Sequence, residues 1–286
     1  MISKKNASLI GLVLVAIIWG STFTFNKMAL YGLTPISLMA TRFMIAFILM
    51  ITIFRKKFKN IKFKNCIGGF LCGLALFLAF ILQTYGLIYT TASKQAFLSG
   101  AYVIAVPFLT WFAFKKTPNL KTYLGTAICF YGISLLSFNS DMSINIGDIL
   151  TLISSIMFAA QIVIAGYYID REDAAVMSTV QFGVIGILST IFLLIMKDFS
   201  FITIITDITS PTSLSVFYLG IIGTATAYYL QILSQKYTSP TATSIILSME
   251  AVFGTIIAVL ILGDVITLKM IFGAIAILIA ILISEL

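Results

Sequence analysis

Long apolar runs dominate this sequence, and their length decides the solvent in which the chain folds. Ten such runs can be counted, and a run of about 20 apolar residues is long enough to cross the hydrocarbon core of a bilayer as an α-helix. Only 10% of the 286 residues are charged, too few to cover the surface of a soluble domain of this size. The sequence therefore predicts an all-α integral membrane protein with ten transmembrane helices and no room for a second, soluble domain.

The predicted spans divide evenly between the two halves of the chain. Those of the first half lie at Leu9–Leu30, Pro35–Phe54, Cys66–Ile88, Ser93–Phe114 and Lys121–Phe138. Those of the second half lie at Asp148–Ile169, Ala174–Met196, Leu214–Lys236, Thr241–Leu262 and Leu268–Ser284. The segment Asp198–Ser213 contains Pro211 and several Ser and Thr residues, so we expect an outer loop there and not a span.

The basic residues set the expected orientation, because cytoplasmic loops of membrane proteins hold an excess of Lys and Arg. With the N-terminus inside, most basic residues fall on the inner side, at positions 4–5, 55–64, 115–121, 171 and 236. Those on the outer side are Lys27, Lys94, Lys197 and Lys269. We therefore expect a protein of the cytoplasmic membrane with both termini in the cytoplasm. The basic residues that give the net charge of +8 lie between the apolar runs and not on one amphipathic face. Their placement therefore does not indicate binding to nucleic acid.

The two halves are similar at a constant offset of 148 residues. The matches are Ala79 with Ala227, Gln83 with Gln231, Tyr89-Thr90 with Tyr237-Thr238, and Gly125 with Gly273. Between them Pro107 aligns with Ala251 at an offset of 144, which predicts one extra helical turn in the fourth span. The sequence thus predicts two five-helix repeats, residues 1–138 and residues 139–286.

The number of spans in each half determines how the halves are related. Because five is an odd number, the second half enters the membrane in the opposite direction to the first, and the repeat is inverted. Inverted repeats are typical of transporters in which a binding site near the membrane midplane is exposed to each side in turn. The topology therefore predicts a secondary transporter that works by alternating access.

Several motifs resemble those of one family of membrane transporters. They are Trp19-Gly20-Ser21-Thr22-Phe23, the stretch from Thr34-Pro35 to Arg42-Phe43, Tyr89-Thr90-Thr91-Ala92-Ser93, Tyr237-Thr238-Ser239-Pro240 and Ser248-Met249-Glu250-Ala251-Val252-Phe253. With them the chain is similar, over essentially its whole length, to the EamA-like branch of the drug/metabolite transporter superfamily. The resemblance implies two inverted five-helix repeats, a cavity lined largely by spans 1, 3, 4, 6, 8 and 9, and export of small metabolites, often amino acids or related compounds. Where the family usually has Glu-Pro in span 9, this chain has Glu250-Ala251, which retains the carboxylate without a proline to bend the helix.

Two ionisable residues are predicted to lie deep in the membrane, Arg42 in span 2 and Glu250 in span 9. A charge at that depth is costly, so each should face the protein interior or water. Arg42 is either a structural tether to helix-end carbonyls and polar side chains or a contact for an anionic substrate. Glu250 either exchanges a coupling proton, contacts a substrate amine, or forms a fixed ion pair or hydrogen bond.

Neutral polar residues recur at helical spacing in several predicted spans, which places them on one face of each helix. Such a face either lines a cavity or bonds helices to one another, as Ser, Thr and Gln do in membranes. Gln83 and Gln231 are large and occupy equivalent positions of the repeat. The predicted substrate-binding residues are Trp19, Gln83, Tyr102, Gln161, Gln231 and Glu250.

The motifs of other functional classes are absent from the sequence. It has no Gly-x-x-x-x-Gly-Lys-Ser/Thr loop for nucleotide phosphates, no histidine and no cluster of carboxylates. We therefore expect no ATP-driven step, no metal or other cofactor, and no catalysis. The predicted function is export of a small polar or amphiphilic metabolite, an amino-acid-like compound or a drug, with a proton as the candidate coupling ion. The alternatives are a passive channel and, less favoured, a membrane-embedded enzyme.

Overall fold

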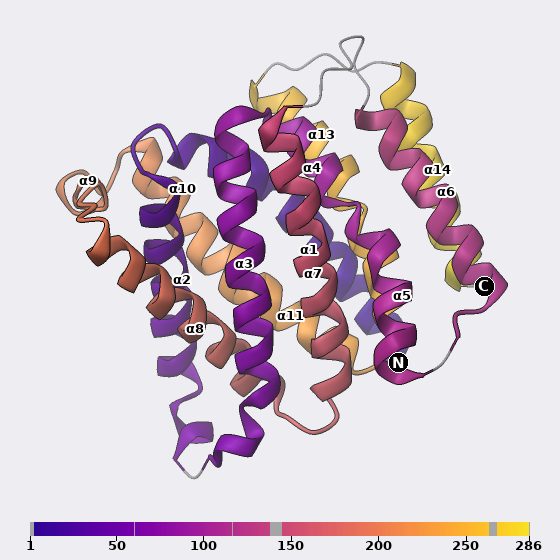
Figure 1. Cartoon of the computed structure of the whole chain (residues 1–286), viewed down its shortest axis with the longest axis horizontal. Helices are drawn as coiled ribbons and strands as arrows, with labels where there is room; N and C mark the ends of the chain where they lie inside the picture. Colours follow the sequence, from indigo (N-terminus) through magenta and orange to yellow (C-terminus); the bar gives the residue numbers. More distant parts are fainter. Residues whose placement is uncertain (1–2, 60, 116, 138–144, 263–267, 286) are drawn as a thin grey trace.

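The computed structural model describes residues 3–59, 61–115, 117–137, 145–262 and 268–285, and every regular element in these ranges is a helix (Figure 1). The prediction of an all-α protein is confirmed. Within the described ranges, seven helical stretches are long and apolar enough to cross a membrane. Shorter apolar helices cover Tyr102–Phe114 and Ile271–Ala280. The chain is therefore a multi-pass membrane protein.

The helices follow the predicted apolar runs closely. The first half forms α1 (Lys4–Ala29), α2 (Pro35–Ile53), η1 (Arg55–Phe58), η2 (Phe63–Asn65), α3 (Ile67–Tyr89), α4 (Ala92–Ser99), α5 (Tyr102–Phe114) and α6 (Leu120–Ser137). The second half forms α7 (Ile146–Tyr168), α8 (Ala174–Ile195), α9 (Ile202–Thr206), α10 (Pro211–Gly220), η3 (Ile221–Thr226), α11 (Ala227–Gln235), α12 (Pro240–Leu247), α13 (Glu250–Leu262) and α14 (Leu268–Glu285). The elements α10, η3 and α11 continue one another as a single apolar stretch.

Three of the helices begin with the same local signal, a hydroxyl residue followed by proline. The side chains of Thr34, Ser210 and Ser239 each accept a hydrogen bond of 3.2 Å from the backbone N–H three residues further on. The proline that follows suits the first helical position, where no N–H partner is needed. The starts of α2, α10 and α12 are therefore set locally by the sequence.

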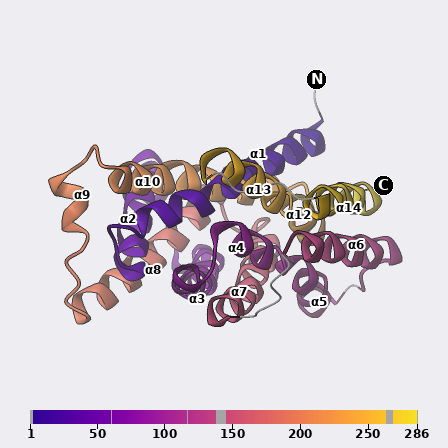
Figure 2. The same ribbon diagram turned by 90° about the horizontal axis from the view of Figure 1, so that it is seen from above.

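The helices pack as a bundle in which neighbours come from both halves of the chain (Figures 1 and 2). The helix α3 lies against α7 and α8, α1 lies against α11 and α13, and α2 lies against α8. The helices α6 and α14 pack on each other at one side of the bundle. Aromatic side chains fill the core, where the ring centroids of Phe43 and Phe80 are 4.9 Å apart and Phe182 and Tyr228 complete the cluster.

Two of the predicted spans are each broken into a short helix and a longer one. The short helices α4 and α12 have 8 residues each, and the helices that follow them, α5 and α13, have 13 residues each. At each joint, residues 100–101 and 248–249, the second residue bonds three residues back instead of four, because Ala101 N donates to Leu98 O and Met249 N donates to Ile246 O, as in a 3-10 turn. Neither joint contains a proline, and Pro107 lies inside α5.

The two broken spans correct one prediction from the sequence. Because α5 begins at Tyr102 and α13 at Glu250, the offset of 148 holds through both spans, and the predicted extra helical turn in the fourth span is wrong. At this offset Pro107 corresponds to Thr255 and not to Ala251. The pairing with Ala251 assumed that Pro107 marks the break, but the break comes earlier, at the joint before Tyr102.

Candidate functional site

A buried polar cavity lies between helices of both halves of the chain. It is formed by α1, α2, α3, α4, α5, α7, α11 and α13. Its lining residues are Trp19, Thr22, Phe23, Arg42, Phe80, Gln83, Ser99, Tyr102, Phe158, Gln161, Ile162, Tyr228 and Glu250. The room for water molecules within it is about 40 Å³, enough for a few waters and far less than the usual volume of a ligand pocket.

Arg42 reaches the cavity from α2 and is 3% exposed. Its Nε donates to Thr224 Oγ1 at 2.6 Å, its Nη1 to Asn26 Oδ1 at 3.3 Å, and its Nη2 to Gly223 O at 3.5 Å. The guanidinium carbon lies 4.8 Å from the centre of the Phe80 ring, a cation–π distance. Among the described residues no Asp or Glu pairs with Arg42. Neutral dipoles and a ring face therefore hold this charge, and the guanidinium has further N–H donors beyond these three bonds.

Two of these partners belong to η3, the π-helical turn between α10 and α11. Within the turn, Thr226 Oγ1 donates to Ile221 O, five residues back, at 2.9 Å. The carbonyl of Gly223 accepts from Trp19 Nε1 at 3.2 Å as well as from Arg42. A π-helical turn shifts the backbone pattern and is frequent at functional sites. The turn thus fixes side chains from both α1 and α2 at the wall of the cavity.

Glu250 is the first residue of α13, and its side chain lines the cavity with 4% exposure. Here α1 and α13 touch, because a Cβ on Gly20 would lie only 2.7 Å from Gly254 N and 2.9 Å from Glu250 O. Within the described part of the chain no Lys or Arg forms an ion pair with Glu250, and the polar side chain of Tyr102 lies next to it. A buried carboxylate without a cation favours the binding of a proton or a cationic group.

The glutamines form short hydrogen-bond chains between helices. Gln83 Nε2 donates to Ser99 Oγ at 2.9 Å, which joins α3 to α4. Gln161 Nε2 donates to Gln231 Oε1 at 3.3 Å, and Gln231 Nε2 donates in turn to Gln235 Oε1 at 2.7 Å. Gln83 and Gln161 line the cavity, whereas Gln231 lies behind Gln161 and does not.

The structure brings five of the six predicted binding residues to one cavity and leaves Gln231 outside it. Those that line it are Trp19, Gln83, Tyr102, Gln161 and Glu250. Arg42, predicted only as an intramembrane charge, lines the same cavity. Sequence reasoning missed the apolar lining residues Phe23, Phe80 and Ile162, because such residues occur on every face of every span and carry no signal of their own.

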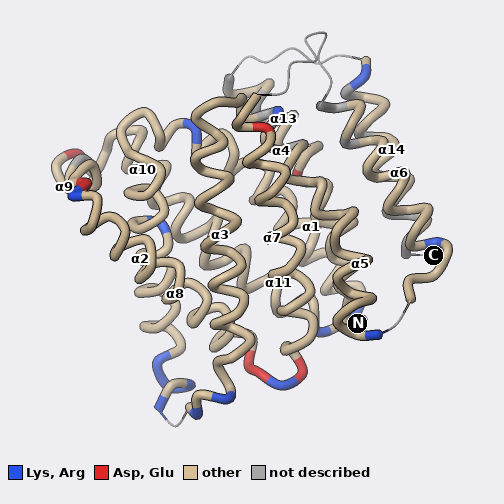
Figure 3. The backbone as a smooth tube through the Cα atoms, viewed as in Figure 1, with Lys and Arg blue, Asp and Glu red and all other residues tan. Residues whose placement is uncertain are grey.

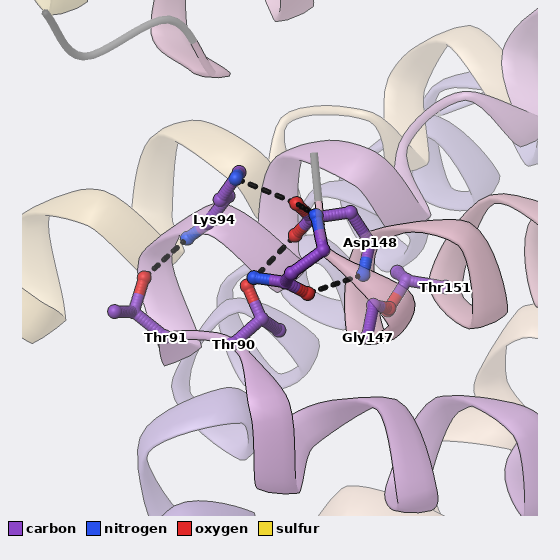
Figure 4. A network of polar contacts seen from close by, with 7 residues as sticks. Thr90, Thr91, Lys94, Gly147, Asp148 and Thr151 are labelled. Atoms are coloured by element: carbon purple, nitrogen blue, oxygen red, sulfur yellow. Dashed lines mark hydrogen bonds and ion pairs between the residues drawn. The ribbon is translucent and has the colours of Figure 1, made fainter. Parts of the chain in front are cut away.

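A second polar cluster lies where α3 ends and α4 and α7 begin, which we name the Lys94 end (Figure 4). Lys94 Nζ is 2.6 Å from Asp148 Oδ2, and the Asp148 side chain is only 3% exposed. Thr90 Oγ1 donates to the other carboxylate oxygen at 3.0 Å. Asp148 also completes a capping box with Asn145 at the start of α7, which satisfies two backbone N–H groups. A buried carboxylate therefore joins three helix ends.

The opposite end of α3 faces a group of basic residues, and we name it the Lys57 end (Figure 3). Lys57 Nζ lies 2.6 Å from Asp173 Oδ2, with side chains 41% and 47% exposed. Partial burial raises the pKa of the Asp173 carboxyl, but the hydrogen bond and charge of Lys57, together with the N–H groups of Ala175 and Val176, lower it more. The pKa of Asp173 therefore lies below its ordinary value.

Comparison with known proteins identifies a family and a fold. The model of the EamA-like transporter family matches residues 6–138 and 145–286. An uncharacterized transporter of Archaeoglobus fulgidus is 34% identical over 277 residues, which is 97% of this chain and 85% of that protein. The uncharacterized transporter YwfM of Bacillus subtilis is 27% identical over 278 residues, 92% of this chain and 88% of that protein. One crystal structure has a TM-score of 0.79 at 12% identity and covers 97% of this chain and 96% of its own, a likeness of fold alone.

Proposed function

Because the chain belongs to the EamA-like transporter family, we propose that it is a secondary transporter that exports a small polar metabolite across the cytoplasmic membrane by alternating access. The observation that carries this proposal is the cavity itself. It takes lining residues from both halves of the chain and holds an arginine, a glutamate and two glutamine side chains. Polar groups of this kind are costly inside a membrane protein unless they serve a ligand or one another.

Alternating access needs two halves that move against each other, and we propose that these are residues 1–138 and 139–286, inverted repeats of five spans each. The two broken spans support this division, because α12 begins 148 positions after α4 and α13 begins 148 positions after α5. The packing of the helices supports this division too. The third span of the first half, α3, packs on α7, the first span of the second half, and the third span of the second half, α10 with α11, packs in the same way on α1. The second spans, α2 and α8, pack on each other, and so do the last spans, α6 and α14. These are the neighbours expected of two equivalent halves related by a two-fold axis. The two separate matches to the family model agree with the same boundary.

The lining residues favour a ligand with both charged or polar groups and an apolar part. Arg42 has N–H donors for an anionic group, and Glu250 suits a cationic group. Gln83 and Gln161 offer amide donors and acceptors, and the ring of Tyr228 adds an apolar surface. Amino-acid-like compounds and amphiphilic drugs fit this description. Substrate contact by Trp19, Gln83, Tyr102, Gln161 and Glu250 is part of the proposal, while Gln231, which was predicted to bind substrate too, holds Gln161 from outside the cavity.

A transporter of this kind takes its energy from a gradient, and we propose Glu250 as the site of a coupling proton. Its carboxylate is buried, lines the cavity and has no described cation beside it. A proton and a substrate amine would therefore compete for one position. Export is the direction that the family motifs imply, and the proposed orientation places both termini in the cytoplasm because the basic loops gather at the Lys57 end.

The proposal is tested in two steps. Metabolites are first measured inside and outside cells that overexpress the protein, and a substrate should accumulate outside while it is depleted inside. Purified protein in proteoliposomes is then loaded with that unlabelled compound, which should drive uptake of the labelled compound above equilibrium. Such counterflow requires a carrier that binds one ligand at a time. Equilibration without an overshoot would identify a passive channel, and a chemically altered product would identify an enzyme.

A further inference from the structure

The helix α4 runs from the wall of the cavity to the Lys94 end. It is only 8 residues long and is joined to α5 through the tight turn at residues 100–101. Its last residue, Ser99, lines the cavity, while Lys94 lies near its beginning. The backbone hydrogen bonds of Ala101, Val103 and Ile104 each close a tight turn of three residues at this joint. Joints at the end of a short helix are the places where a helix can move as a unit.

The helices that face α4 form a firm frame. A Cβ on Gly147 of α7 would clash with the carbonyl oxygen of Gly86 on α3, so the two backbones are in direct contact. On the other side Lys27 of α1 donates to the carbonyls of Leu87 and Thr90 at 2.7 and 3.1 Å. This frame holds Thr90 and Asp148 in place at the edge that α4 contacts.

Polar contacts fasten α4 to this frame at three levels. Nearest the cavity, Ser99 accepts from Gln83 at 2.9 Å. One turn further out, Gln95 Nε2 donates to Gln83 O at 2.6 Å and to Thr151 Oγ1 at 3.3 Å. Outermost is the ion pair of Lys94 with Asp148 (Figure 4). A substrate that leaves the cavity along α4 must separate all three levels.

We propose that the Lys94–Asp148 ion pair is a latch that holds α4 closed over the cavity, and that its release opens the cavity at the Lys94 end. This inference rests on the proposed transport function. The pair differs from an exposed surface pair because the Asp148 side chain is shielded from water and salt. Loss of the Lys94 charge would leave a buried carboxylate without its cation, which favours the open form, where water can reach the carboxylate.

Among the described residues of the second half, the position that corresponds to Lys94 carries no charge. The residue 148 positions after Lys94 is Ala242, in α12. There the first turn of α12 packs through Pro240 on Gly166, where a Cβ would lie 2.6 Å from the proline ring. The two broken spans are thus fastened differently, one by charge and the other by packing.

The latch is tested by the accessibility of the cavity to a thiol reagent, a measurement that needs no substrate. The native residues Cys66, Cys72 and Cys129 are replaced by alanine, and Thr22→Cys places one reporter in the cavity wall. A membrane-impermeant maleimide is added to intact cells. We expect Lys94→Met and Asp148→Asn each to label about tenfold faster than the parent, a shift of about 1.4 kcal/mol between closed and open forms. In Asp148→Asn the backbone N–H of residue 148 still donates to Asn145, the N-cap of α7. A change in labelling therefore reports the loss of the charge and not the loss of the helix cap.

Further variants separate the latch from a general loss of structure. Lys94→Arg keeps the charge and should restore slow labelling. The double variant Lys94→Met with Asp148→Asn should label no faster than either single one, because the two residues act as a pair. The matched control is Lys57→Met, which breaks an ion pair of equal length at the opposite end and should leave labelling from outside unchanged.

The outcomes distinguish the latch from the proposed function. Unchanged labelling in both single variants, in cells and in inverted vesicles, would overturn the latch, as would an equal increase in Lys57→Met. Faster labelling only in inverted vesicles would support the latch and contradict the proposed orientation. A protein that shows no counterflow but opens as described would keep the latch and lose the transport assignment.

Discussion

Tyr102 and Glu250 are the first residues of α5 and α13, two helices of 13 residues that begin 148 positions apart in the sequence. Both side chains line the cavity and lie next to each other. Two positions that lie 148 residues apart therefore meet at one place, with a phenol from α5 and a carboxylate from α13. The two helices have the same length and begin alike there, but only α13 brings an acidic side chain.

Replacement of that carboxylate tests the proposed coupling. We expect Glu250→Gln to abolish transport driven by a pH gradient while exchange of substrate for substrate continues, because the amide keeps the shape and hydrogen bonding of the side chain but cannot ionise. Uptake into proteoliposomes with and without an imposed pH gradient measures both activities. Asp207→Asn, in the connection between α9 and α10, is the control and should leave both unchanged. Proton dependence that survives in Glu250→Gln would remove the coupling role from this residue.

The bond between the π-helical turn and Arg42 predicts that its removal lowers both the stability of the protein and its affinity for substrate. Thr224→Val keeps the volume of the side chain but leaves Arg42 Nε without its acceptor at 2.6 Å. We expect a loss of stability of about 1.5–3 kcal/mol, the range for a hydrogen bond to a charged group, together with weaker substrate binding. Thermal unfolding in detergent and the KM for transport provide the two readings.

Two control variants test whether the effect comes from the bond to Arg42. Thr224→Ser retains the oxygen and should restore binding. Thr226→Val removes a hydroxyl that, within the described part of the chain, bonds to Ile221 O of its own turn, and this variant should leave the KM unchanged. A KM that rises equally in both valine variants would mean that the turn as a whole matters and that the Arg42 bond has no separate role.

The close approach of α1 and α13 predicts that small substitutions differ sharply between neighbouring glycines. A Cβ on Gly20 would lie 2.7 Å from Gly254 N and 2.8 Å from Phe253 Cβ, whereas a Cβ on Gly254 has Ala96 Cβ at 3.2 Å as its nearest neighbour. We expect Gly20→Ala to destabilise the protein by about 1–3 kcal/mol through overpacking. Gly254→Ala should cost less than Gly20→Ala, because its contacts with Ala96 Cβ at 3.2 Å and Gly20 O at 3.3 Å are longer and the helix propensity gained offsets part of the cost. Equal unfolding temperatures for the two variants would contradict this packing.

The ion pair at the Lys57 end predicts a dependence of stability on pH. The pKa of Asp173 is lowered in the folded protein from its ordinary value of 3.8, so its stabilising effect is present above pH 3.8 and is lost as the pH falls through the lower, folded value. Asp173→Asn keeps the cap of α8 and removes the charge. The wild type should unfold at a slightly higher temperature at neutral pH, and the difference should vanish in strong acid. A difference that persists there would assign the effect to the cap.

Much of the fold could be predicted from the sequence because the apolar runs and the helix starts are local signals. Thr34 and Ser239, each followed by proline, begin helices where expected. The breaks in the fourth and ninth spans could not be predicted, since residues such as Ala101 and Met249 are compatible with an unbroken helix. Nothing in the sequence of Ile221–Thr226 distinguishes a π-helical turn from an α-helix either.

Part of the candidate site could also be predicted from local signals in the sequence. Helical spacing places Trp19 and Thr22 on one face, and both line the cavity. The capping box of Asn145 and Asp148 is visible as a motif, but the partner of Asp148 lies 54 residues away in Lys94, and only the packing of α4 on α7 brings them together. Gln231 shows the limit of repeat symmetry, because it is equivalent to Gln83 in sequence and yet does not reach the cavity.

The small volume between Trp19 and Glu250 affects how ligands should be sought. With room for only a few water molecules, this conformation would reject almost any compound in a docking search, including a true substrate. Side chains must rearrange before anything larger enters, so selectivity depends on the energy of that rearrangement as well as on shape. Compound libraries would therefore be better screened against a variant with its entrance released, such as Asp148→Asn, than against the closed protein.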